Sequence, residues 1–175
     1  FGREDIQHLI ERPDLSEELA GKFAKVMDIR EFAESDLGLP VGGNYSSYVD
    51  VEREHVVWNV FAAAEFSVDP VNWCYPIAGC VAYRGYFSEK SALSYAAKLE
   101  EDGFDVYTGG VDAYSTLGWF EDSLLSTVLN RADYQLAGLI FHELAHQLVY
   151  LPGDTTFNES FATAVEREGV RRWLA

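Results

Sequence analysis

The sequence predicts an α+β fold, and the order of residue types along its 175 residues is the reason. A helical stretch comes first, a region rich in strand-forming residues follows, and two more helices end the chain. Strands gathered in one part of a chain are typical of α+β domains. With 48% hydrophobic residues, we expect one domain over residues 1–175, made of a helical part (1–44), a sheet-rich part (45–131) and a terminal pair of helices (132–175).

The charge of the chain restricts its partners. The formal net charge of −16 repels phosphate, so nucleic acid and anionic membrane surfaces are excluded as partners. No run of about eighteen apolar residues is present, so we expect no transmembrane segment in this chain. The oligomeric state is not indicated by the sequence.

The first long helix is expected from Asp14 to Leu37. Arg12-Pro13-Asp14 favours its start and Gly38-Leu39-Pro40 its end. His8 lies outside this helix among charged residues, which indicates a solvated histidine. The apolar residues of the stretch are spaced three and four apart and predict one packing face: Leu15, Leu19, Phe23, Val26, Ile29, Phe32 and Ala33.

Strands are expected from Tyr45 to Phe66. This region is rich in the β-branched and aromatic residues that strands favour. We expect an antiparallel hairpin that turns near Glu52-Arg53-Glu54. His55 would then be exposed beside the turn, although it is a candidate metal ligand.

The segment Trp73 to Phe87 holds both cysteines. Cys74 and Cys80 lack a metal-binding C-x-x-C spacing, and Pro76 with Gly79 allows a bend that would bring them together. A disulfide suits an exported protein, and two free thiols suit a cytosolic one. The segment itself fits either an edge strand that binds a substrate main chain or an ordinary core strand.

One more helix and one more strand precede the end of the chain. The helix is expected from Ser88 to Glu101 and the strand from Phe104 to Thr108. The apolar residues that we expect the helix to direct towards the core are Leu93, Ala96, Ala97 and Leu99.

The stretch ADYQLAGLIFHELAHQLVY predicts a buried helix over residues 132–150. It contains the pattern H-E-x-x-H, which places His142 and His146 one turn apart on one face. Glu143 lies about 100° round the helix from His142, near enough to touch a water on a bound ion. Unpaired, such groups would cost several kcal/mol in an apolar helix, and a zinc ion would be a suitable partner.

A catalytic zinc ion takes a third protein ligand, and Glu159 is the candidate. Pro152-Gly153 ends the histidine helix, and a second helix beginning near Phe157 would bring Glu159 opposite the two histidines. An alternative is that Thr156 and Glu159 form a capping box, in which Glu159 only serves the helix start. Asp154 is the reserve ligand.

Several motifs together resemble a known family. HELAHQ followed by FNESFA, with GVDAYSTLGWF and WCYPIAGCVAYRGYF upstream, is similar to the bacterial family described as putative aminopeptidases. These are zinc-peptidase-like proteins of the cell envelope, and the resemblance covers nearly the whole chain. It implies a zincin-like domain that hydrolyses peptides, with His142, His146 and Glu159 as zinc ligands and Glu143 as general base.

The resemblance also implies a role for GVDAYSTLGWF. It would line the substrate cleft, and Tyr114 would donate a hydrogen bond to the oxyanion. A core tyrosine with a satisfied hydroxyl is the alternative. The family carries a lipoprotein-type signal, so we expect an excised domain of a longer protein in the cell envelope.

Two features depart from the better-known gluzincin aminopeptidases, which share an Asn-Glu-x-x-Ala run like that at Asn158. The gap from His146 to Glu159 is shorter, and the Gly-x-Met-Glu-Asn element that holds the substrate amine is absent. Glu166, two turns after Glu159, is a candidate amine anchor, a support for the metal site or a surface glutamate. A zinc endopeptidase and a non-catalytic binding protein, with Cys74 or His55 as an extra ligand, therefore stay open, as does a domain without metal.

Overall fold

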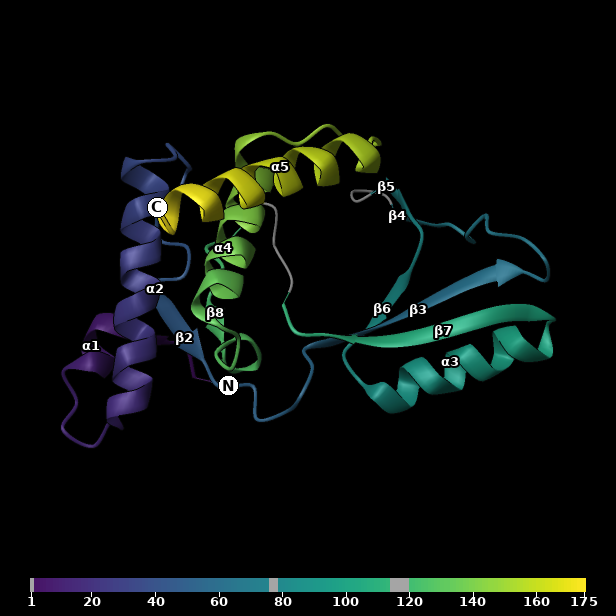
Figure 1. The fold of residues 1–175 in the computed structure, drawn as a ribbon. Coiled ribbons are helices and arrows are strands. Elements are labelled where there is room, and N and C mark those ends of the chain that lie inside the picture. The colour runs from purple at the N-terminus through teal and green to yellow at the C-terminus, as the bar shows by residue number, and fades with distance from the viewer. Residues whose placement is uncertain (1, 76–78, 114–119) are drawn as a thin grey trace. The chain divides into compact units, whose positions relative to one another are not determined.

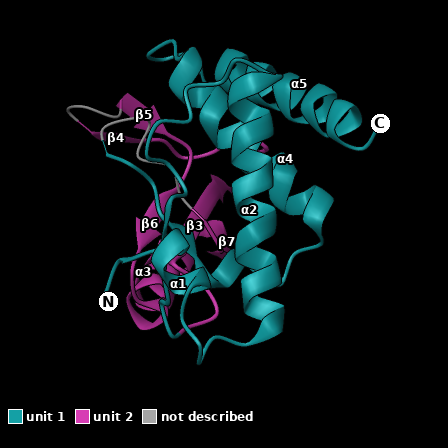
Figure 2. Ribbon diagram, turned by 90° about the vertical axis from the view of Figure 1, so that its left-hand side faces the viewer, with its two compact units in different colours: residues 1–52, 115–175 teal, residues 53–114 magenta. Residues whose placement is uncertain are grey.

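The computed structural model describes residues 2–75, 79–113 and 120–175. Helices and small sheets combine in an α+β fold, as predicted (Figure 1). The chain packs as two compact units, residues 1–52 with 115–175 (unit 1) and residues 53–114 (unit 2) (Figure 2). None of the described helices combines the length and apolarity of a membrane span. One domain over residues 1–175 stays a prediction.

The first long helix of unit 1 is α2, Glu17–Ser35. The Ser16 side chain caps it by accepting a hydrogen bond from the Leu19 amide. Its buried residues keep the predicted three-and-four spacing: Phe23, Val26, Ile29 and Ala33. A short helix before it, α1 (Ile6–Ile10), was not predicted, because only two of its residues, Ile6 and Leu9, are buried.

A small sheet in unit 1 joins β1 (Glu4–Asp5), β2 (Ser47–Val49) and β8 (Leu124–Leu125). The predicted hairpin near Glu52-Arg53-Glu54 is wrong, because β2 pairs with β1 and, in parallel, with β8. The amide of Val51 donates to Ser126 Oγ, at 3.0 Å, in the short 3₁₀ helix η1 (Ser126–Val128). After β2 the chain therefore stays in contact with the segment that follows β8 and does not form a hairpin.

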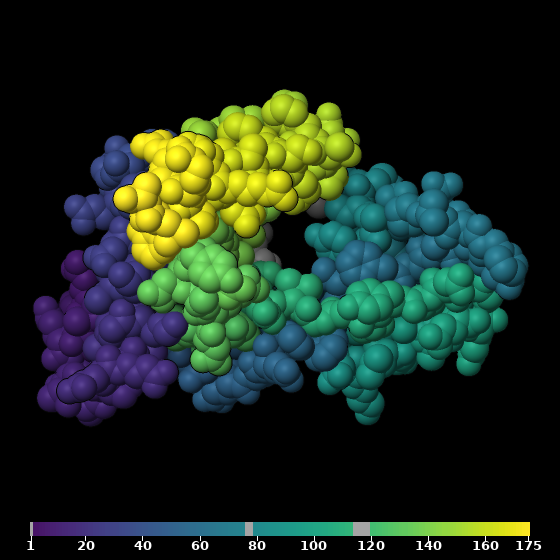
Figure 3. Space-filling model, in the orientation of Figure 1, coloured from purple at the N-terminus to yellow at the C-terminus, as the bar shows by residue number. Residues whose placement is uncertain are grey.

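Two helices complete unit 1, α4 (Asp133–Leu148) and α5 (Thr155–Trp173). They pack directly against each other, and in the space-filling view the side chains of α5 lie against those of α4 (Figure 3). Glycines permit the close approach: Gly169 faces the Phe141 ring, and Gly138 faces the Glu166 side chain. Phe141 also meets Phe32 of α2, with ring centroids 6.0 Å apart.

Unit 2 has its own core, built from a sheet and one helix. β3 (Val57–Ala64) pairs with β6 (Arg84–Tyr86) and with β7 (Phe104–Val111), which is longer than predicted. α3 (Glu89–Glu101) packs on this sheet, and its buried residues are Ala92 and Ala96. The predicted core positions Leu93 and Ala97 are wrong; both are exposed, because the small alanines one turn apart form the contact face.

Both cysteines lie in a separate two-stranded sheet of β4 (Trp73–Tyr75) and β5 (Gly79–Val81). Cys74 and Cys80 are directly opposite and form a disulfide, so of the two alternatives the disulfide is confirmed. Among the described strands, β6 pairs with β3 alone and so lies at the edge of its sheet. Substrate binding along this edge stays a prediction.

Candidate metal centre

Helix α4 supplies both histidines of the candidate metal centre. His142 and His146 lie one turn apart, and their rings meet edge to face at 4.8 Å between centroids. The intervening Leu144 and Ala145 are fully buried and anchor α4 in the core. The side chain of His146 is 8% exposed and that of His142 is 19% exposed, so both imidazoles are largely shielded from solvent.

The turn before α5 places Glu159 opposite the histidines. Asp154, the reserve ligand, instead caps α5 by accepting a hydrogen bond from the Phe157 amide at 2.9 Å. The buried Asn158 side chain holds the turn with two hydrogen bonds of 2.8 Å, to the amide and to the carbonyl of Leu151. Because Asp154 is the cap, the alternative of a Thr156–Glu159 capping box is not what the structure has.

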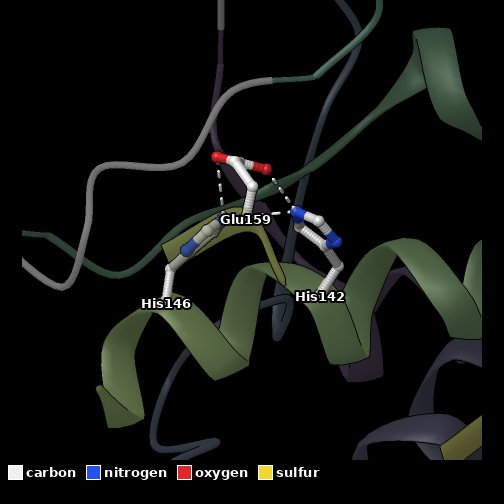
Figure 4. A group of neighbouring side chains, drawn as sticks. All are labelled: His142, His146 and Glu159. Carbon is white, nitrogen blue, oxygen red and sulfur yellow. Dashed lines mark hydrogen bonds and ion pairs between the residues drawn. The ribbon is translucent and has the colours of Figure 1, made fainter. Parts of the chain in front are cut away.

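Three ligand-type atoms converge at this point (Figure 4). The Nε2 atoms of His142 and His146 are 3.2 Å apart. The Glu159 carboxylate lies 3.3 Å from His142 Nε2 and 3.6 Å from His146 Nε2. Ligands at about 2.0–2.1 Å from a tetrahedral zinc ion are separated by about 3.3 Å, so this donor set fits one small cation.

The protonation state of His146 also suits metal binding. Burial lowers the pKa of His146, and this effect outweighs the opposing attraction of Glu159; the positive form of His142 lowers the pKa further. A lowered pKa keeps the imidazole neutral at neutral pH. The neutral form is the one whose nitrogen lone pair can bind a metal.

The second ring nitrogens of the two histidines have different surroundings. His142 Nδ1 lies 3.0 Å from Glu166 Oε2, a contact that orients the ring and directs Nε2 at the other ligand atoms. His146 Nδ1 is buried and has no hydrogen-bond partner among the described residues. Of the three roles considered for Glu166, the contact favours support of the metal site.

Glu143 lines a cavity of about 590 Å³ next to His142. Tyr45, a buried residue on the segment after α2, lies close enough to Glu143 for the charge of this carboxylate to affect its pKa. Burial raises the pKa of Tyr45 well above its usual range, and the negative charges of Glu143 and Asp122 add to the effect. Tyr45 was not a sequence candidate, because nothing in its local sequence ties it to a glutamate almost a hundred positions later.

The remaining candidates fall outside this group. Tyr114 lies outside the described residues. The expectation that His55 is exposed is wrong: its Nδ1 is 2.7 Å from Asp112 Oδ1 and its ring fills the space beside Gly110. Cys74 is in the disulfide and so has no thiolate to bind a metal. His55 and Cys74 both belong to unit 2, and neither is part of the group formed by His142, His146 and Glu159.

Comparison with known proteins identifies a family. The sequence profile of the family described as "Putative aminopeptidase" matches residues 2–175. No curated protein and no solved structure matches the chain.

Proposed function

Since the chain belongs to the putative aminopeptidase family, we propose that it is a zinc-dependent peptidase that removes N-terminal residues from peptides. One observation carries the metal part of the proposal. Two imidazole nitrogens and a carboxylate approach one another at 3.2 to 3.6 Å, the spacing of ligands around one small cation. Three protein ligands would match the ligand number of catalytic zinc sites, which keep a further position for water.

Each residue of the centre has a distinct task in this proposal. His142, His146 and Glu159 hold the zinc ion. Glu166 accepts a hydrogen bond from His142 Nδ1, which fixes the tautomer that presents the Nε2 lone pair. Asn158 positions Glu159 by holding the turn between the two helices.

Glu143 performs the proton transfers. When bound, the zinc ion supplies a Lewis acid that polarises the scissile carbonyl and lowers the pKa of a water molecule. The Glu143 carboxylate would accept a proton from the attacking water and then give this proton to the leaving amine. Tyr45 remains protonated at neutral pH and so adds no negative charge beside Glu143. The oxyanion role proposed for Tyr114 rests on the family resemblance alone.

Metal content tests the first part of the proposal. Protein purified in the presence of zinc is expected to contain about one zinc ion per chain. Glu159→Ala should lose most of this zinc, and Glu168→Ala, on the same helix but paired with Arg171, should retain it. Protein without metal by elemental analysis, or a Glu159→Ala variant that binds zinc as tightly as the parent, would contradict the assignment.

Glu143→Gln tests the general base. The variant should retain zinc and lose peptide hydrolysis by orders of magnitude, since the amide cannot accept the proton. Hydrolysis at the parent rate would remove Glu143 from the mechanism.

Peptides with free and acetylated N-termini test the position of cleavage. A requirement for the free amine supports an aminopeptidase, and equal cleavage of both forms indicates a zinc endopeptidase. Cleavage of neither form by zinc-loaded protein favours a non-catalytic binding protein. That alternative needed an extra ligand from Cys74 or His55, and the disulfide and the Asp112 contact engage both residues elsewhere.

Location and fold family complete the proposal. We assign the protein to the cell envelope, and the Cys74–Cys80 disulfide supports this because such bonds persist in oxidising compartments. The sequence of helices α4 and α5 around the ligand group supports a zincin-like domain. Fractionation of cells that produce the full-length protein tests the location, and recovery in the cytosol would contradict it.

A further inference from the structure

The cavity beside the metal centre extends well beyond the residues that the mechanism uses. It lies within unit 1 between α4 and α5 and has a volume of about 590 Å³, within the range of small-molecule sites. Leu139 and Val170 give it apolar walls, and Tyr134 adds an aromatic one. His142 and Glu143 lie at the end of the cavity nearest the metal ligands.

Two arginines also line this cavity, Arg131 before α4 and Arg167 on α5. The chain has 13 basic and 29 acidic residues, so a cavity lined by two arginines is richer in positive charge than the chain as a whole. Glu143 and Glu166 line the same cavity, but Glu166 contacts His142 and Glu143 follows His142 directly. The negative groups thus gather at the metal end.

Arg167 has an unusual environment among the arginines of the chain. Within the described residues it makes neither an ion pair nor a hydrogen bond. The two arginines that follow it on α5 are both engaged, Arg171 with Glu168 and Arg172 with the carbonyl of Asp36. A guanidinium with five donors and no acceptor, at the rim of a cavity, is free to bind a carboxylate of a ligand.

The direction of proton transfer decides which part of a substrate enters the cavity. Glu143 gives its proton to the leaving amine, so the residue that carries this amine lies next to Glu143. The cavity is the space that Glu143 itself lines. Along α4, the ten residue steps from Asp133 to Glu143 rise by about 15 Å, the length of four or five extended peptide residues.

We propose that the cavity between α4 and α5 receives the leaving-group side of the substrate and, through Arg167 and Arg131, selects peptides that carry a carboxylate there. The proposal rests on the proposed peptidase function. Arg167 is next in sequence to Glu166, which touches His142, so it serves a carboxylate within about two residues of the scissile bond. The carboxylate is either the C-terminal group of a short peptide or an acidic side chain.

Binding to zinc-loaded Glu143→Gln protein tests the proposal without turnover. Three dipeptide probes separate the two sources of the carboxylate: Leu-Gln amide has none, Leu-Gln free acid has the C-terminal one, and Leu-Glu amide has the side-chain one. By isothermal titration calorimetry, at least one carboxylate probe should bind about tenfold more tightly than Leu-Gln amide. The probe that gains affinity identifies the source.

Arginine variants attribute the preference to the cavity. In the same Glu143→Gln background, the double substitution Arg131→Gln with Arg167→Gln should abolish the preference. Arg171→Gln is the matched control, because this arginine is on the same helix but pairs with Glu168, and it should keep the full preference. Circular dichroism verifies that each variant is folded. These comparisons also remove direct binding of the carboxylate to zinc as an explanation, since such binding would survive in the arginine variants.

The outcomes separate this inference from the proposed function. Equal binding of all three probes, or a preference that persists without both arginines, overturns the carboxylate site. Parent protein that hydrolyses peptides without any such preference keeps the peptidase proposal and overturns only the selectivity. A carboxylate preference that depends on the arginines, in a protein whose parent form hydrolyses no peptide, supports the site and overturns the peptidase function.

Discussion

The two histidines of the candidate centre are held in different ways. His142 is oriented by the Glu166 carboxylate, 3.0 Å from its Nδ1, whereas the Nδ1 of His146 is buried without a partner among the described residues. His146 is instead held by the burial of its side chain and by the contacts of its Nε2 with His142 and Glu159. A hydrogen bond to the nitrogen that does not bind the metal typically increases ligand basicity. Glu166 should therefore contribute to zinc affinity although it is not a ligand.

Removal of this carboxylate provides the first test at the scale of residues. Glu166→Ala should weaken zinc binding by about 10- to 100-fold, because His142 loses the partner that fixes its ring and tautomer. Competition with a zinc chelator measures the affinity. Glu168→Ala is the control on the same helix, and a Glu166→Ala affinity equal to that of this control would show that the contact is not needed.

Tyr45 predicts a change of stability at alkaline pH. Its pKa is raised in the folded state, so above pH about 10 the unfolded chain loses the phenol proton and the folded protein retains it. The folded state then binds more protons, and the free energy of unfolding falls by up to about 1.4 kcal/mol per pH unit. This contribution to stability is complete below pH about 10 and is lost as pH rises towards the folded pKa.

Urea unfolding between pH 8 and 11 measures this effect. Tyr45→Phe should flatten the decline, since phenylalanine has no proton to lose. Tyr107→Phe is the control, because Tyr107 is 67% exposed, and its profile should match that of the parent. An unchanged alkaline slope in Tyr45→Phe would contradict the assignment.

The sequence predicts the residues of the centre only where local spacing decides their geometry. The i, i+4 spacing of His142 and His146 needs nothing beyond a helix, and Glu159 follows because one short turn separates two helices. The charge of Glu143 acts on Tyr45, and His55 contacts Asp112, only because the folded chain brings these distant positions together. No local pattern in the sequence contains such contacts.

At the scale of elements, the crossing of α4 and α5 determines whether the three ligands meet. The two helices approach closely where Gly169 lies against Phe141. A Cβ atom added to Gly169 would be 2.7 Å from Phe141 Cδ2 and 2.9 Å from Leu37 Cδ1. Phe141 is fully buried, so its ring has little room to move aside. A larger residue at position 169 would force the helices apart.

Gly169→Ala should therefore destabilise the protein by about 1–3 kcal/mol, the usual cost of overpacking a core. It should also weaken zinc binding, because a shift of α5 moves Glu159 away from the histidines. Gly21→Ala in α2 is the matched control: no atom lies within 4 Å of its added Cβ, and the change should stabilise by about 0.5–1 kcal/mol. Denaturant unfolding compares the two, and a Gly169→Ala protein as stable as Gly21→Ala would contradict the tight crossing.

Elements stabilised by interactions between nearby residues were predicted well, and pairings between distant residues were not. Helices α2, α3, α4 and α5 were predicted close to their observed bounds, since helical hydrogen bonds and periodicity are local. The hairpin prediction failed because residue types that favour a strand do not indicate which other strand it pairs with. Tyr48 pairs with Glu4 on one side and with Leu124 on the other, and only tertiary packing selects those partners.

At the scale of the whole molecule, the chain divides its tasks between two units. Unit 1 joins both ends of the chain and contains His142, His146 and Glu159. Unit 2 is one continuous segment with its own core at Val60, Ala92 and Ala96, and with the disulfide. The sequence did not reveal this division, because both units mix apolar and charged residues and no linker composition marks the boundaries.

This division predicts where a bound metal stabilises the molecule. A ligand that binds only the folded state stabilises it by about 2.7 kcal/mol at a concentration of 100 times the Kd. Among the described residues the metal group belongs wholly to unit 1. Zinc should therefore slow hydrogen exchange in α4 and α5, whose separation by local unfolding would break the ligand set, and leave exchange in β3 and β7 nearly unchanged.

Hydrogen exchange followed by mass spectrometry, with and without zinc, measures this pattern peptide by peptide. The Glu159→Ala variant is the control, because it retains both helices and lacks the third ligand, and its exchange should respond little to zinc. Equal protection of β3 and β7 would mean that the two units unfold as one cooperative body, since binding to unit 1 would then stabilise unit 2 as well. Protection confined to unit 2 would place the metal away from His142, His146 and Glu159, and the candidate centre would then have to be abandoned.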